Sequence, residues 1–239
     1  MQNLLPDEMM PKPFEGFAPD GFAFLTELAE RQDRTWFNDN RHRYEAALRD
    51  PMAALLAALS DDLAARKIPL RADPKRSVFR IHRDVRFSRD KSPYKTHIGA
   101  TLTRDGSKMA DGLLYLHVDP AAPFAAAGFY QPAPPELDAI RQAVAGEPAA
   151  FRRMLTALSK SGLALSPDED AAKRTPRGFE TVEAPDLLDA LRRKSFIVRR
   201  PLTRDELSRP GLVTAMTDFA AAAMPLLRFG WKALDGYAG

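Results

Sequence analysis

The 239-residue sequence contains no cysteine, which excludes disulfide bonds, thiolate metal ligands and cysteine nucleophiles. It also lacks a glycine-rich phosphate loop, a Gly-x-Ser-x-Gly elbow and a His-Glu-x-x-His helix. The N-terminal residues show no basic stretch followed by an apolar run, and no apolar run approaches the length of a membrane-spanning helix. We therefore expect a cytoplasmic protein with neither a signal peptide nor a membrane anchor.

The net charge is small, but the basic residues are unevenly distributed. The sequence has 35 Lys and Arg against 32 Asp and Glu, a formal charge of +3. Between Arg71 and His97, however, 9 basic residues accompany 3 aspartates, so this segment carries +6 and the remainder about −3. A basic character concentrated in one short segment argues against a broad nucleic-acid-binding face.

The periodicity of apolar residues predicts helices, then strands, then helices. Helical spacing begins after Asp20, again at Thr35 as an N-cap, and again at Asp50-Pro51. Alternation predicts strands, mostly joined by short connections, at 78–87, 95–103, 112–119, 124–130 and 195–202. Further helices are predicted at 135–145, 148–159 and 185–193, and from 212 with a kink or break at Pro225. The fold class is α+β, a single domain (19–239) with an antiparallel β-meander sheet and flanking helices. An irregular, loosely packed arm (1–18) precedes it.

The basic segment is itself predicted to form two antiparallel strands between Val78 and Thr103. Its alternation places Phe79, Ile81, Val85 and Phe87 on one side of the first strand. The turn-forming residues between Ser88 and Pro93 connect it to the second. We expect the buried side chains to be Phe79, Ile81, Ile98 and Leu102.

The stretch FRIHRDVRFSRDKSPYKTH, residues 79–97, resembles a specific family. Together with Arg34, Trp36, Phe37 and Asn40 upstream, it is similar to the conserved-hypothetical family DUF2461. KRTPRGF at 173–179 and Lys194-Ser195 resemble further blocks of that family, so the similarity spans nearly the whole chain. The resemblance implies one compact cytoplasmic domain of bacterial type and assigns no catalytic residue.

Several cations of the basic segment are candidates for one anion-binding surface, because Arg offers a bidentate fork and Lys a point charge. The candidate ligand-binding residues are Arg80, Arg86, Lys91, Tyr94, Lys95 and His97, supported by Asn40, His82, Asp84, Asp90 and His117. The alternative is that Arg83, Asp84, Arg89 and Asp90 pair among themselves and hold the turn rigid. Three aspartates cannot neutralise nine bases, which favours a bound anion.

Three of the four histidines fall on the polar sides of predicted strands. If the strands are in register, His82, His97 and His117 converge with Asp84 or Asp119 and form a facial metal site. No local pair has the spacing of a recognised metal motif. We therefore expect no tightly bound transition metal, and the sequence indicates no cofactor.

The sequence thus favours a protein that binds or acts on a small anionic ligand, for example a phosphorylated molecule, through a basic strand-turn-strand motif. The alternative is a structural or protein-interaction module whose charged motif is an internal salt-bridge network. No membrane or nucleic acid is expected as a partner, and the sequence assigns neither a reaction nor an oligomeric state.

Overall fold

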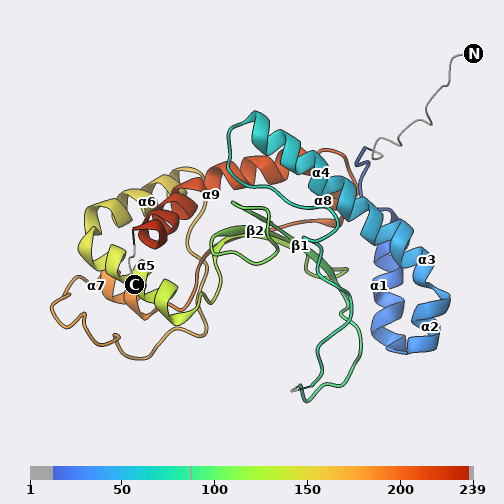
Figure 1. Ribbon diagram of the computed structural model, residues 1–239, viewed down its shortest axis with the longest axis horizontal. Coiled ribbons are helices and arrows are strands. Elements are labelled where there is room, and N and C mark those ends of the chain that lie inside the picture. Colours follow the sequence, from blue (N-terminus) through green and yellow to red (C-terminus); the bar gives the residue numbers. More distant parts are fainter. Residues whose placement is uncertain (1–12, 87, 237–239) are drawn as a thin grey trace, which may run out of the picture.

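Four strands form one antiparallel sheet at the centre of the structure, a computed structural model that describes residues 13–86 and 88–236 (Figure 1). The strands are β1 (Ile98–Thr103), β2 (Leu113–Val118), β3 (Phe124–Phe129) and β4 (Phe196–Pro201). They lie in the order β1-β2-β3-β4, and every neighbouring pair is antiparallel. The predicted α+β class with an antiparallel meander is confirmed.

The two faces of the sheet differ in burial. In β2 the side chains alternate: Leu114, Leu116 and Val118 are fully buried, whereas Tyr115 and His117 are half-buried. The buried face continues across the sheet with Ala100, Leu102, Ala125, Ala127, Phe129, Phe196 and Val198. One face therefore belongs to the core, and the other carries the polar and half-buried side chains.

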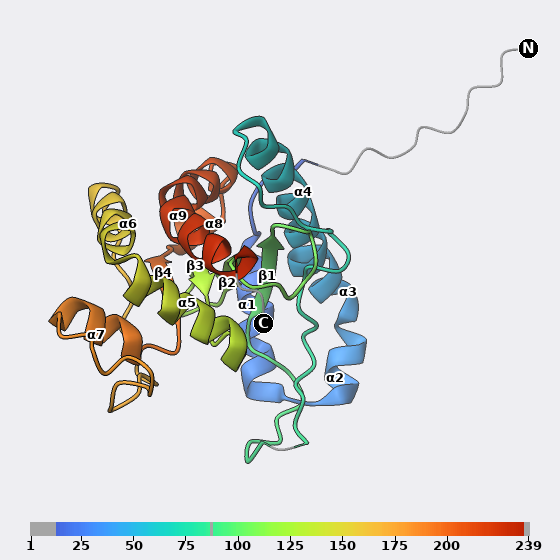
Figure 2. The same ribbon diagram turned by 60° about the vertical axis from the view of Figure 1, so that its left-hand side comes forward.

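Helices α4 (Asp50–Ala65) and α9 (Leu212–Asp235) cover the core face. They lie side by side above the sheet in Figures 1 and 2, α4 against β1 and α9 against β3 and β4. Gly230 permits the close approach of α9, because a Cβ added there would lie 2.2 Å from atoms of the Phe129 ring. One turn of α9 is thus fitted directly onto an aromatic side chain of β3.

The first third of the domain is helical, as predicted, but two details differ. It contains α1 (Pro19–Arg31), α2 (Arg34–Asp39), α3 (Arg41–Tyr44) and the π-helical turn η1 (Glu45–Arg49) before α4. The N-cap of α2 is Asp33 and not Thr35, since the Asp33 carboxylate accepts the Trp36 N–H at 2.8 Å. α4 begins at Asp50-Pro51 as predicted, but Asp50 is not an N-cap, because the residue before it is already helical. The chain stays helical from Arg41 to Ala65, and the turn that precedes Pro51 is the wide π-helical one.

The helices after β3 gather at one end of the sheet. They are α5 (Pro134–Gly146), α6 (Pro148–Lys160) and α7 (Pro185–Arg192), close to their predicted positions, and each begins with proline at its first turn. The short α8 (Arg204–Leu207) was not predicted, although Thr203 and Glu206 form a capping box at its start. In Figure 1, α5 to α7 lie at the opposite end of the domain from α1 to α3.

α9 is long and apolar enough to cross a membrane by length and composition, contrary to the expectation from the sequence that no segment would be. Half of its most apolar window is buried inside the domain, against the sheet and α4, α5 and α6. Pro225 neither breaks nor ends it. The burial is that of a core helix.

The segment before α1 is irregular but well packed. Phe14 and Phe17 are buried with ring centroids 5.6 Å apart, and the Phe17 N–H donates to the Leu207 carbonyl of α8 at 2.9 Å. Residues 13–18 are therefore tied to the C-terminal third of the chain, more tightly than a loose arm. The rest of the predicted arm, 1–12, lies outside the described residues.

The basic segment forms an irregular hairpin instead of the predicted regular strand pair. Outside β1 its pairing is limited to isolated bridges, among them Val78 with Ala100 and His82 with Tyr94. Between these two bridges the outgoing chain advances four residues and the returning chain six. The two extra residues form a bulge, which breaks the period of two on which the prediction rested.

One side chain of the hairpin was assigned to the wrong face of the sheet. Ile81, Ile98 and Leu102 are buried as predicted. Phe79 is only half-buried and faces the open side of the sheet, where Lys95 and Lys108 lie over its ring. Phe87, predicted to share its side, lies outside the described residues.

The contact between Gly230 and Phe129 gives a stability prediction with a matched control. Gly230→Ala adds a methyl group where no space exists and should destabilise the domain by about 1–3 kcal/mol, after subtracting any gain in helix propensity. Gly146→Ala, at the end of α5, meets no atom within 4 Å and should be neutral or slightly stabilising. Urea denaturation of both variants measures the difference. Equal midpoints would show that α9 can shift away from Phe129.

Candidate functional site

An open hollow of about 820 Å³ lies on the half-buried face of the sheet. Its floor includes Ala126 and Gly128 of β3 and Ile197 of β4. Ala126 and Ile197 occupy strand positions that alternate with the core-facing ones, and Ala126 and Gly128 have no side chain large enough to fill the space above the sheet. The volume is in the range of small-molecule sites.

The walls of the hollow are aromatic, and its rim exposes large apolar side chains to water. Phe79, Tyr115 and Phe124 line it. Met109 and Tyr130, which also line it, are 72% and 68% exposed. Exposed apolar side chains gathered around one concavity are typical of a binding surface.

Basic side chains flank the hollow without acidic partners. The ammonium groups of Lys95 and Lys108 lie 5.4 and 5.1 Å from the centroid of the Phe79 ring, and the Arg199 guanidinium lies 3.5 Å from that of Phe124. Among the described residues, none of these three cations forms an ion pair with a carboxylate. Burial lowers the pKa of Lys95 and of Lys108, and the nearby charge of Arg80 lowers both further.

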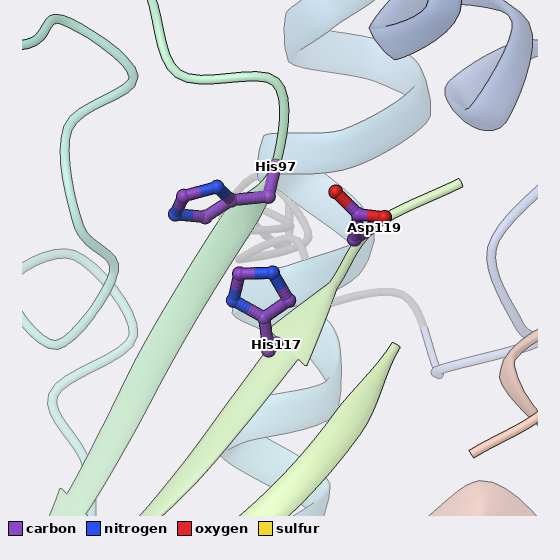
Figure 3. Close-up of side chains that lie close together, drawn as sticks. All are labelled: His97, His117 and Asp119. Atoms are coloured by element: carbon purple, nitrogen blue, oxygen red, sulfur yellow. The ribbon is translucent and has the colours of Figure 1, made fainter. Parts of the chain in front are cut away.

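His97, His117 and Asp119 lie together at the end of the β1–β2 pair (Figure 3). One ligand atom from each side chain lies within 4.8 Å of the others. The two imidazole rings are 4.2 Å apart between centroids, and the Tyr115 hydroxyl is 3.0 Å from His117 Nδ1. Burial lowers the pKa of both histidines, and burial together with the nearby charge of His97 lowers that of His117 to about 4.

Burial also raises the pKa of Tyr115 to about 12, so its hydroxyl stays protonated near neutral pH. The ring occupies the space above Gly99 of β1, where an added Cβ would lie 2.6 Å from the tyrosine oxygen. Gly99 is therefore the residue that lets Tyr115 lie across β1 and reach His117. A neutral imidazole next to a protonated phenol leaves the second ring nitrogen of His117 free for another partner.

The tip of the basic hairpin projects away from the body of the domain (Figure 1), and it contains two internal ion pairs. The Arg83 guanidinium donates to Asp90, and Arg86 pairs with Asp84 at 2.7 Å. The Lys91 ammonium donates to the Val85 carbonyl at 2.9 Å. Arg86 and Lys91 are thus placed in the tip, apart from the hollow that Lys95 and His97 line.

Tyr94, His82 and Asn40 belong to the packing between the hairpin and the N-terminal helices. Tyr94 is 3% exposed and stacks on Phe37 with centroids 4.4 Å apart, and His82 lies against the same two rings. The Asn40 side-chain amide donates to the Trp36 carbonyl at 2.9 Å and its oxygen accepts from Arg43. Of the candidate residues, the structure brings together Lys95, His97 and His117, with Arg80 nearby.

Comparison with protein families gives one match. The family model described as "Conserved hypothetical protein (DUF2461)" matches residues 20–229. The chain belongs to this family. The resemblance of its central motif is confirmed, and the match includes every residue of the hollow. Comparison with curated proteins and with solved structures gives no match.

Several residues around the hollow were not among the candidates from the sequence. These are Phe79, Lys108, Asp111, Tyr115, Phe124 and Arg199. Alternation had already placed Tyr115 on the same side of its strand as His117, which was a usable signal. Lys108 lies in the connection between β1 and β2, and Arg199 on a strand almost seventy residues beyond β3, so only the tertiary structure brings them to Phe79 and Phe124.

The tip of the hairpin gives a prediction on pH. The Ser92 hydroxyl and N–H, and then Arg83, lower the pKa of Asp90 from 3.8 to about 2. Because the folded-state pKa is depressed, the stability that Asp90 contributes is present above pH 3.8 and is lost as the pH falls through about 2. Carboxyl-carbon NMR should follow its titration near that value. In Ser92→Ala the pKa should rise toward 3.8, and an unchanged titration would contradict the assigned cause.

Proposed function

We propose that this protein binds a small organic anion in the hollow on the open face of its sheet. The observation that carries the proposal is the unpaired basic rim, Lys95, Lys108 and Arg199, around the apolar floor of an open hollow. The ligand that fits has a flat apolar body, to lie on Ala126 and Gly128, and an acidic group such as a phosphate.

The contrast between the two parts of the basic hairpin supports this proposal. In the projecting tip, Arg83 and Arg86 have aspartates as partners, and the Lys91 ammonium donates to a backbone carbonyl. At the hollow, Lys95 and Lys108 lie on one aromatic ring close to a third positive charge, and among the described residues neither lysine forms an ion pair with a carboxylate. Like charges held close together destabilise the fold, and an anion bound between them reverses the sign of that interaction.

The aromatic walls restrict the chemistry of the ligand further. Phe79, Tyr115 and Phe124 offer ring faces and edges against which a planar or aromatic body can pack. The floor of small side chains allows that body to approach the sheet backbone closely. An inorganic anion alone would leave the apolar part of the hollow solvated, so the proposal is for an organic anion.

The second candidate function is a structural or interaction module, and the paired charges of the hairpin tip favour it. In that case the tip is a rigid projection and the hollow is incidental. The exposure of Met109 and Tyr130 at the rim favours an occupied hollow instead.

The proposal places the protein in the cytoplasm and treats α9 as a core helix, because its apolar side chains pack on the sheet. Nucleic acid is no part of it, since the unpaired cations flank one hollow and form no extended stripe.

Thermal unfolding of the metal-free protein tests the proposal, with phenyl phosphate as the probe at constant ionic strength. At ten times its Kd, phenyl phosphate should stabilise the protein by about 1.4 kcal/mol, which corresponds to a rise in Tm of about 3–5 °C. Equal concentrations of phenol or sodium chloride should give no comparable shift. Lys95→Gln combined with Lys108→Gln should abolish the response, because both ammonium groups at Phe79 are then gone.

Lys91→Gln is the matched control, since it removes a lysine of the same segment whose ammonium donates to the Val85 carbonyl. This variant should respond as the wild type does. If phenol stabilises the protein as much as phenyl phosphate does, or if the double variant keeps the full response, the anion proposal fails. The structural-module function would then take its place.

A further inference from the structure

His97, His117 and Asp119, whose side chains are of types that bind metal ions, lie together at one end of the hollow because of the register of β1 and β2. Ile98 pairs with Val118, so His97, one residue before β1, and Asp119, one residue after β2, are the next residues across from each other. His117 precedes Asp119 by two residues and therefore lies on the same face of the sheet. The backbone pairing itself, and not a chance choice of rotamer, brings the two imidazoles and the carboxylate together.

The ligand atoms of the three side chains lie close together without bonding to one another. Their ligand atoms lie within 4.8 Å of one another. Within the described part of the chain, no hydrogen bond or ion pair joins Asp119 to either histidine. Figure 3 shows a ring nitrogen of His117 turned toward the space between His97 and Asp119. Three donors directed at one small volume, each without a bond to the others, suit a cation placed between them.

Neighbouring groups orient two of the three ligands. The Tyr115 hydroxyl lies 3.0 Å from His117 Nδ1, which fixes the ring and leaves Nε2 available. One oxygen of Asp119 accepts the N–H groups of Ala121 and Ala122 at 2.8 and 2.9 Å, which leaves the other oxygen free. Such outer hydrogen bonds are typical of metal sites, because they hold the ligand in position before the ion arrives.

We propose that His97, His117 and Asp119 bind one divalent transition-metal ion at the end of the hollow. Two imidazoles and one carboxylate suit zinc, iron, manganese or cobalt and leave coordination positions open. His97 and His117 line the hollow, so the open positions face it. Water or an acidic group of a ligand can occupy these open positions and coordinate the ion directly. The lysines at Phe79 offer only charge and hydrogen bonds.

This site goes beyond the proposed anion binding and rests on different residues. The sequence led to the expectation of no tightly bound metal because no local histidine pair has a recognised spacing. The register of two strands supplies the proximity that local spacing does not. His82, the third histidine of the predicted cluster, packs against Phe37 and Tyr94 and is no part of the site.

Isothermal titration of the full-length, tag-free protein after removal of metals by chelation tests the proposal, with Zn²⁺ as the probe. We expect binding of one Zn²⁺ per chain. The double variant His97→Ala/His117→Ala should weaken it by at least about a hundredfold, and Tyr115→Phe by about tenfold, since outer partners typically contribute 10–100-fold. His42→Ala, an exposed histidine on α3, and His82→Ala should bind as the wild type does. Equal affinity of the wild type and the double variant would overturn the site.

A second measurement uses the wild type alone and does not depend on the folding of any variant. One equivalent of Co²⁺ should produce visible absorption bands and shift or broaden the imidazole NMR signals of His97 and His117, with those of His42 unchanged. Uniform broadening of all histidine signals, or none, would refute the proposal. The phenyl phosphate experiment is carried out without metal, so failure of either proposal is visible separately from the other.

Discussion

In the described part of the chain, helices cover only one face of the sheet, and this one-sided burial determines where a site can lie. α4 and α9 bury the apolar side chains of alternate positions, and the intervening positions of every strand turn the other way. On that side β3 presents Ala126 and Gly128 between larger neighbours, so the concavity is a direct result of small residues on one central strand. The basic hairpin closes one edge of it and contributes its charge.

Much of the architecture was predictable because burial on one face imposes a period on the sequence. β2 and β3 were predicted within two residues of their ends, and in β2 the apolar residues Leu114, Leu116 and Val118 alternate with Tyr115 and His117. Helices α5 to α7 were equally visible, because each begins at a proline and carries an apolar stripe. Of the candidate ligand-binding residues in the basic segment, Lys95 and His97 line the hollow.

The composition of the site was less predictable because it depends on register and on distant strands. Alternation tells which face a side chain occupies but not which residue lies opposite, so His117 could not be paired with His97 from the sequence. The expected side of Phe79 was wrong because the hairpin pairs only through isolated bridges at this point, whereas a strict alternation of sides requires a regular strand. The sequence grouped the cations of the basic segment into one candidate surface because they are close in sequence. The fold separates them: Arg86 and Lys91 lie in the tip of the hairpin, and Lys95 lies at the hollow.

The π-helical turn Glu45–Arg49 has a consequence for how one long helical stretch serves two partners. Each residue added to a helix rotates the following side chains by about 100° around the axis, so a wide turn changes the angular phase of everything after it. Before the turn, Tyr44 packs on Phe24 of α1; after it, the leucines of α4 pack on α9 and β1. The number of residues in this turn, more than their identity, determines that the apolar side chains before it and those after it both face their partners. Loss of a single residue there would leave the helix intact and turn one stripe out of the core.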